Sequence, residues 1–168
     1  MRNMLNSILR IAQFLLLLIT TALIGNVRAA TRNATGDATA AINFAIFVCA
    51  VSWLAALYSL AANFVSSIAI PLITLSADAA ATLFTFIGAV VLSAKLTSVN
   101  CAHWGTKSPD WIAFGSADTE KRCREIQAGL VFMWFLFATF AVALALTFRE
   151  LRRSGGSVRG PSMSQIGV

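Results

Sequence analysis

The chain has 168 residues, of which 58% are hydrophobic and 12% are charged. A soluble domain carries about a quarter charged residues, so this composition excludes an ordinary water-soluble globular domain. The formal net charge is +6, but the basic residues sit at segment ends and in connections. Because they form no basic helix or aromatic platform, we expect membrane lipids as partners and no nucleic acid.

Four apolar segments account for the hydrophobic excess, at about residues 8–26, 42–65, 68–96 and 126–148. Each is close to or above the roughly 20 residues that cross a bilayer as a helix. The sequence therefore predicts an all-α fold, an integral membrane four-helix (tetraspan) bundle. We expect this domain to occupy residues 1–150 and a short basic tail to occupy residues 151–168.

The first segment also resembles a secretory signal peptide, with small residues around Arg28 that suit cleavage. We interpret it as a retained first span, because cleavage would leave three spans and put the termini on opposite sides. The polar connection that follows contains Asn33-Ala34-Thr35, an acceptor pattern for N-glycosylation at Asn33. An unmodified loop is an equal alternative; if the pattern is used, this loop faces the lumen or the exterior.

The second and third spans are joined by a very short turn at Ser66–Ala69, and Pro71 follows it in a helix-initiating position. These two spans are predicted to form an antiparallel hairpin. Counting outward from the turn places Tyr58 at about the depth of Asp78.

Asp78 is a carboxylate within an apolar span, which costs about 2.5–3.5 kcal/mol even on lenient insertion scales. We expect it to be satisfied by uncharged polar groups, as a clamp made with Tyr58, Thr74 and Thr82, because the spans show no evident cationic partner. Gln13 and Thr139 are further candidates. The alternative is that Asp78 serves a small ion- or proton-coupled transporter or channel.

The third span also carries small or hydroxylated residues at every fourth position, which lie on one face of a helix. Such a stripe lets another helix approach closely, within the bundle or between protomers of a homo-oligomer. Its members are Ala77, Ala81, Thr85, Ala89 and Ser93.

The second long connection holds two cysteines, Cys101 and Cys123. They are either two free thiols or a disulfide, which would close about 23 residues and contribute roughly 3 kcal/mol. The same connection contains Trp104 and Trp111, which we expect to anchor it in the headgroup layer of the outer leaflet. A lipid-headgroup or partner site is the sharper alternative for these two residues.

The numbers of basic residues on the two sides of the membrane are nearly equal, so they do not orient the chain. The glycosylation pattern and the cysteine pair both suit an exterior face, which places both termini in the cytoplasm. The tail would then bring basic side chains to anionic lipids. These are Arg149, Arg152, Arg153 and Arg159.

The sequence does not indicate an enzyme. His103 is a lone histidine, and we find no nucleophile with a base at recognisable spacing and no glycine-rich phosphate loop. Ligand spacing for a metal is also lacking. We expect no cofactor beyond a bound lipid such as a sphingolipid or sterol.

Several short motifs, in this order and spacing, resemble one known family. They are Ile8-Leu9-Arg10-Ile11, Ala62-Asn63-Phe64, Asp78 followed by Phe84-Thr85-Phe86, Arg122-Cys123-Arg124 with Gln127-Ala128, and the closing Pro161-Ser162-Met163-Ser164-Gln165. From about Asn6 onward the chain resembles the fungal MARVEL-domain tetraspans of the non-classical export and eisosome group.

The resemblance implies a multi-pass protein of the plasma membrane with both termini cytoplasmic. It also implies a non-enzymatic organiser of eisosome-type, sphingolipid-responsive microdomains, linked to unconventional protein export. The implied partners are membrane lipids, further copies of the chain, and peripheral eisosome coat proteins on the cytoplasmic side.

Overall fold

This computed structural model describes residues 2–34, 36–65, 70–97, 100–103, 105, 107–108 and 110–154. Four helices make up most of the described chain: α1 (Arg2–Ala29), α2 (Gly36–Phe64), α3 (Pro71–Leu96) and α4 (Thr119–Ser154). All four are long and apolar enough to cross a membrane. The prediction of an all-α, four-span membrane fold is confirmed.

α1, α2 and α4 begin well before their apolar segments, because helical structure does not end where the hydrocarbon ends, whereas α3 begins at Pro71, inside its predicted segment of residues 68–96. α2 begins at Gly36 and has Asp37 in its first turn, where a negative charge favours the helix N-terminus. α4 begins at Thr119, and the Asp118 carboxylate accepts a hydrogen bond from the Lys121 amide at 2.9 Å. α4 also continues to Ser154, so the first residues of the predicted tail are helical.

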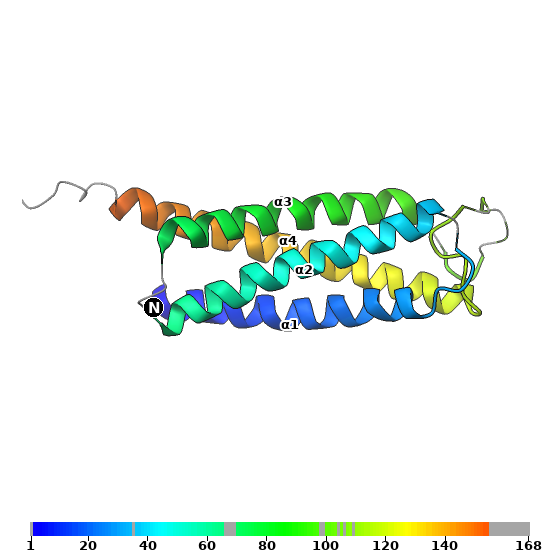
Figure 1. Cartoon of the computed structure of the whole chain (residues 1–168), viewed down its shortest axis with the longest axis horizontal. Helices are drawn as coiled ribbons and strands as arrows, with labels where there is room; N and C mark the ends of the chain where they lie inside the picture. The colour runs from blue at the N-terminus through cyan, green and yellow to red at the C-terminus, as the bar shows by residue number, and fades with distance from the viewer. Residues whose placement is uncertain are drawn as a thin grey trace, which may run out of the picture.

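The four helices run side by side as an elongated bundle (Figure 1). α1 begins and α4 ends at one end of it, here called the terminal end. The connections between α1 and α2 and between α3 and α4 lie at the other, here called the loop end. Each helix contacts two others in the cyclic order α1, α2, α3, α4, so α1 and α3 lie diagonally opposite.

Apolar side chains occupy both the inside and the outside of this bundle. Leu17, Val48, Leu92 and Phe140, one from each helix, are completely buried. Outside, Leu54 is 72% exposed and Phe135 is 55% exposed. Large apolar side chains on the surface of a long helix suit lipid rather than water. The exposed apolar side chains and the length of the helices both indicate a bundle that lies in a bilayer.

Candidate functional site

Arg10 and Asp78 form an ion pair inside the bundle. The guanidinium donates from Nη1 to Asp78 Oδ1 at 2.7 Å and from Nη2 to Asp78 Oδ2 at 2.6 Å. The two side chains are 2% and 0% exposed. Two parallel charge-assisted bonds of this kind are stronger than hydrogen bonds between neutral side chains, and they fix the relative orientation of the two groups.

The pair joins two helices that do not touch as neighbours. Arg10 is on α1 and Asp78 on α3, so their contact crosses the centre of the bundle. At 1.5 Å per residue, Arg10 lies about 12 Å from the start of α1 and Asp78 about 11 Å from the start of α3. Both helices run from the terminal end, so the two charges meet at one depth.

Polar groups from α1 and α4 complete the cluster. Gln13 Oε1 accepts a hydrogen bond from Arg10 Nη1 at 3.1 Å, and Gln13 Nε2 donates to the Thr139 carbonyl oxygen at 3.2 Å. The Thr147 hydroxyl lies 3.5 Å from Asp78 Oδ2. Gln13 is completely buried. The Arg10 ion-pair cluster therefore links α1, α3 and α4.

The expectation of uncharged partners for Asp78 was wrong, because Arg10 neutralises it. The Thr82 hydroxyl donates instead to the backbone oxygen of Asp78 at 2.6 Å, and the Thr74 hydroxyl donates to the Ile70 carbonyl oxygen. These are bonds within α3 and do not use the carboxylate. Tyr58 is half-buried on α2. Its predicted role in the clamp remains a prediction.

The Arg10 ion-pair cluster has no net charge, and its contacts hold α1, α3 and α4 together. The guanidinium carries a permanent positive charge, since arginine does not lose its proton in proteins, and it offers two donors to the Asp78 carboxylate. Arg10 Nε is buried and has no hydrogen-bond partner, so the pair bears some desolvation cost. Removal of one partner from such a pair is strongly destabilising, by about 3–5 kcal/mol.

The predicted small-residue stripe lies against the other helices of the bundle. Ala81, Thr85 and Ala89 are completely buried, while Ala77 and Ser93 at the ends are partly exposed. The Thr85 and Ser93 hydroxyls donate to Ala81 and Ala89 carbonyl oxygens at 2.7 Å, which satisfies them within α3. The centre of the stripe is thus used inside one chain and is not open to a second protomer.

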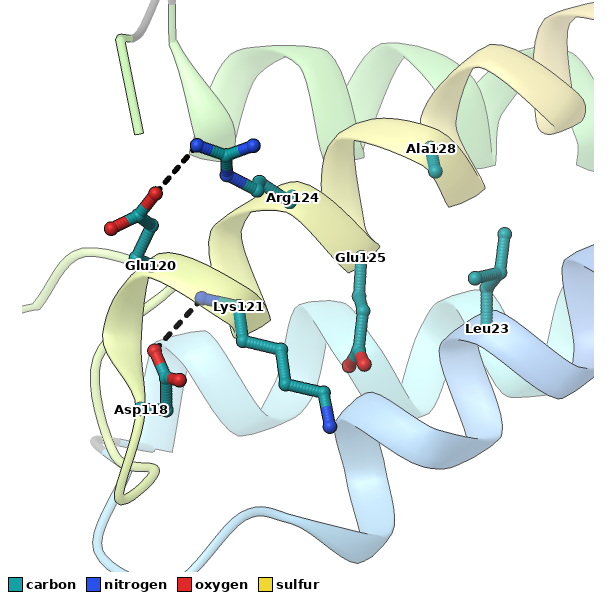
Figure 2. A pocket seen from close by; sticks show the side chains of 7 residues that line it. All are labelled: Leu23, Asp118, Glu120, Lys121, Arg124, Glu125 and Ala128. Atoms are coloured by element: carbon teal, nitrogen blue, oxygen red, sulfur yellow. Dashed lines mark hydrogen bonds and ion pairs between the residues drawn. The ribbon is translucent and has the colours of Figure 1, made fainter. Parts of the chain in front are cut away.

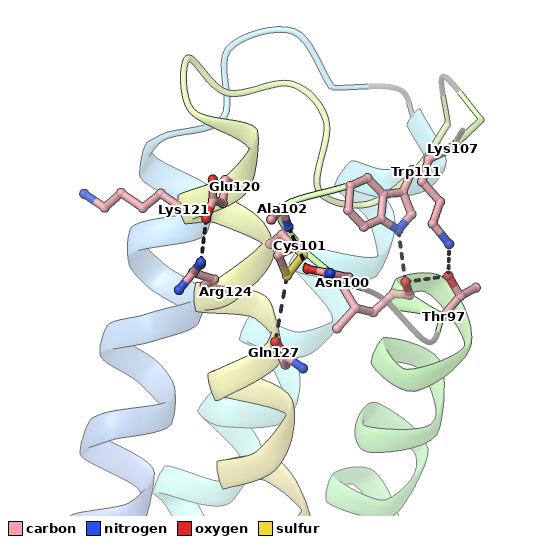
Figure 3. The surroundings of a disulfide bond; sticks show 12 residues. Thr97, Asn100, Cys101, Ala102, Lys107, Trp111, Glu120, Lys121, Arg124 and Gln127 are labelled. Carbon is pink, nitrogen blue, oxygen red and sulfur yellow. Dashed lines mark hydrogen bonds and ion pairs between the residues drawn. A yellow bond between two sulfur atoms is a disulfide. The ribbon is translucent and has the colours of Figure 1, made fainter. Parts of the chain in front are cut away.

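The loop end is fastened by a disulfide between Cys101 and Cys123, with 5.7 Å between their Cα atoms. Trp111 lies beside it, and its Nε1 donates to the Leu96 carbonyl oxygen at 3.0 Å (Figure 3). The prediction that Trp111 anchors the loop in lipid was wrong, because the side chain is 5% exposed. It caps the free carbonyl end of α3 instead. Trp104 lies outside the described residues.

Arg122 is a second buried arginine, 2% exposed at the start of α4. It donates from Nε to the Ile112 carbonyl oxygen at 3.2 Å, and from Nη1 to the Val27 carbonyl oxygen at 3.2 Å and to the Thr31 hydroxyl at 2.6 Å. It thereby ties the end of α1 to the loop before α4. From the sequence, Arg122 is singled out only as part of a family motif, and this role is missed.

The remaining predicted sites lie at the two ends. Asn33 is exposed, but Thr35 of its glycosylation pattern lies outside the described residues. Arg149 and Arg152 are exposed on the last turns of α4. The Arg153 side chain and all of Arg159 lie outside the description. Within the described residues, no three or more His, Cys, Asp or Glu side chains gather as metal ligands do.

Comparison with known proteins relates this chain to one protein family and to two yeast proteins. Residues 3–146 match the model of the MARVEL family, described as a membrane-associating domain. The chain is 30% identical to non-classical export protein 2 of Saccharomyces cerevisiae, over 96% of this chain and 97% of that protein. It is 27% identical to non-classical export protein 2 homolog 1 of the same yeast, over 68% of this chain and 65% of that protein. No solved structure matches the chain.

Proposed function

Because this chain belongs to the MARVEL family of membrane-associating domains, we propose that it is a non-enzymatic organiser of plasma-membrane microdomains. In this proposal, the microdomains are of the eisosome type and respond to sphingolipids. A link to unconventional protein export is the natural extension, since the relative that matches over almost its whole length is named for non-classical export.

The observation that carries the proposal is the buried Arg10–Asp78 pair. It neutralises the intramembrane carboxylate inside the bundle, while large apolar side chains cover the outside. With its charged pair inside, the bundle contacts the surrounding lipid through apolar side chains. This arrangement favours a scaffold over a transporter, in which Asp78 would have to bind and release a proton or an ion.

The charged ends of the bundle fit the same role. Arg149 and Arg152 are exposed on α4 beyond its apolar part, where each would gain about 1 kcal/mol near an anionic lipid surface. We place this end in the cytoplasm, where peripheral coat proteins would also meet it. The disulfide at the loop end supports that orientation, because disulfides persist on exterior faces.

Two measurements on the intact protein test the proposal. A fluorescent fusion expressed in a fungal cell should form immobile clusters at the plasma membrane, and depletion of sphingolipids should disperse them. Purified protein in sealed vesicles should show no proton or ion flux above empty vesicles. A flux abolished by Asp78→Asn would favour the transporter, and uniform distribution of the fusion in the membrane would contradict the scaffold.

A further inference from the structure

Two surface cavities, both wide open to the outside of the bundle, follow one another along the seam between α1 and α4. The one at the loop end has a volume of about 550 Å³, and its lining combines Leu23 and Ala128 with charged side chains of α4 and of Asp118 (Figure 2). The second lies deeper and has a volume of about 410 Å³. Leu9, Leu16, Phe132 and Phe135 are among its lining residues. One cavity is charged and the other is almost wholly apolar.

The spacing of the lining residues shows that both cavities lie on the same strip of surface. Leu16 and Leu23 are two helical turns apart on one face of α1. On α4, Ala128, Phe132 and Phe135 follow at steps of four and three, which also keeps them on one face. α1 and α4 run in opposite directions, so Leu23 lies level with Ala128 and Leu16 with Phe135. The seam therefore leads from the charged cavity into the apolar one.

The dimensions of the seam match one leaflet. Phe135 lies about 17 Å along α4 from Arg124, at a rise of 1.5 Å per residue. Half of a hydrocarbon core of about 30 Å is about 15 Å. With the charged cavity at headgroup level, the apolar cavity lies at the depth of the acyl chains. A lipid of the loop-end leaflet could occupy both.

The charges at the loop end are of both signs. Arg124 pairs with Glu120, and Glu125 accepts a hydrogen bond from Asn26 Nδ2 at 2.8 Å. The Lys121 ammonium takes part in none of the ion pairs among the residues that the structure describes, and only its backbone amide donates a hydrogen bond, to Asp118. Lys121 and Glu125 both extend from α4 toward α1 (Figure 2). An available cation next to a carboxylate complements a headgroup that carries a phosphate and an amine.

We propose that the α1/α4 seam binds one zwitterionic phospholipid. The headgroup lies in the loop-end cavity with its phosphate at Lys121 and its cationic group at Glu125. One acyl chain lies in the apolar cavity between Leu16 and Phe135. A purely anionic headgroup fits less well, because three carboxylates line the charged cavity, those of Asp118, Glu120 and Glu125. This inference goes beyond the proposed function, because the lipid site is tested by crosslinking and the proposed function by clustering, and either test can fail without the other.

Photo-crosslinking tests the site directly. The whole protein is reconstituted in vesicles that contain a trace of phosphatidylcholine with a diazirine on its acyl chain, irradiated, and mapped by peptide mass spectrometry. We expect several-fold more labelling around Leu16 and Phe132–Phe135 than around Leu54 on α2 or Leu83 on α3, although both of these are at least as exposed as Phe135. Uniform labelling of all exposed faces would overturn the proposal.

Charge variants test the headgroup. Lys121→Gln and Glu125→Gln should each reduce labelling of the seam several-fold, while Lys95→Gln, at the same end on α3, should leave it unchanged. A phosphatidylglycerol probe should label the seam less than phosphatidylcholine does. Equal labelling by the two probes, or no effect of Lys121→Gln, would overturn the assignment of a zwitterionic lipid.

A steric variant separates a lipid from a second protomer. Ala128→Trp should fill part of the loop-end cavity, which Ala128 lines, displace the headgroup and remove the label at Phe135, with helicity by circular dichroism unchanged. A photoreactive amino acid at position 135 should yield lipid adducts. Crosslinks between two copies of the chain in their place would assign the seam to an oligomer interface and overturn the proposal.

Discussion

Arg10 and Asp78 neutralise each other across the diagonal of the bundle, between two helices that are not neighbours. A contact of this kind fixes the rotation of α1 and of α3 about their axes together, because a turn of either helix would separate the two charges. Gln13 and Thr147 extend the same constraint to α4. The cluster specifies how the helices are arranged.

The first prediction concerns the two charges. Asp78→Leu should lower the free energy of unfolding by about 3–5 kcal/mol, because it leaves Arg10 buried and unpaired. The double variant Arg10→Leu/Asp78→Leu should recover most of that loss. Denaturation of the purified protein in mixed detergent micelles, followed by circular dichroism, measures both. Ser76→Leu on the exposed face of α3 serves as a control. A double variant less stable than the single one would contradict the view that the unpaired Arg10 causes the loss.

The second prediction concerns the stripe on α3. Ala81→Leu and Ala89→Leu should each destabilise the bundle by about 1–3 kcal/mol, because both positions are completely buried and leave no room for added methylenes. Ala79→Leu, on the exposed face of the same helix, should be nearly neutral. The same detergent titration compares the three variants. Equal effects at positions 79 and 81 would show that the stripe makes no close contact.

The third prediction concerns Gly115, which has a φ of +94° and lies against the first connection. A Cβ at this position would come 2.6 Å from the Cα of Ala34, and the Gly115 carbonyl oxygen accepts a hydrogen bond from the Arg32 amide at 2.8 Å. Gly115→Ala should cost about 1–3 kcal/mol through strain and loss of this contact. Gly105→Ala is the matched control, because its Cβ would meet nothing within 4 Å. Hydrogen exchange of the Arg32 amide should rise in the first variant alone.

The fourth prediction concerns the disulfide. Replacement of Cys101 and Cys123 by serine should lower the free energy of unfolding by about 3 kcal/mol on the chain-entropy account. A loss well below this value would mean that Trp111 and Arg122 hold the loop without it. Reduction of the native protein from outside intact cells, followed by a membrane-impermeant maleimide, also tests orientation. Labelling should occur from outside; labelling only after permeabilisation would reverse the proposed topology.

The fifth prediction concerns the exposed arginines at the end of α4. Arg149→Gln/Arg152→Gln should reduce association of the reconstituted protein with labelled phosphatidylserine by about 1 kcal/mol per residue, most clearly at low salt. Energy transfer between a fluorophore at this end and the labelled lipid measures the change. Lys107→Gln at the loop end is the control. If association with phosphatidylserine changes neither with salt concentration nor in the double variant, the result would argue against an anionic-lipid contact.

The sequence by itself determined the number of spans, their apolar character and the helical start at Pro71. These depend on the length and composition of single segments, because crossing a bilayer needs about 20 apolar residues and a helix satisfies its own backbone. It also singled out Asp78 and the pair Cys101 and Cys123. Each of these features can be read along one stretch of chain without knowledge of what packs beside it.

Only the tertiary structure decided which side chains face each other. From the sequence, the basic residues are taken together, as charges at segment ends and in connections, although α1 and α3 run in the same direction and place Arg10 level with Asp78. Counting along a helix gives depth, but the direction in which a side chain points depends on how all four helices pack. The burial of Trp111 and Arg122 has the same origin. Their partners Leu96 and Val27 lie at the ends of other helices, and only the closed bundle brings them together.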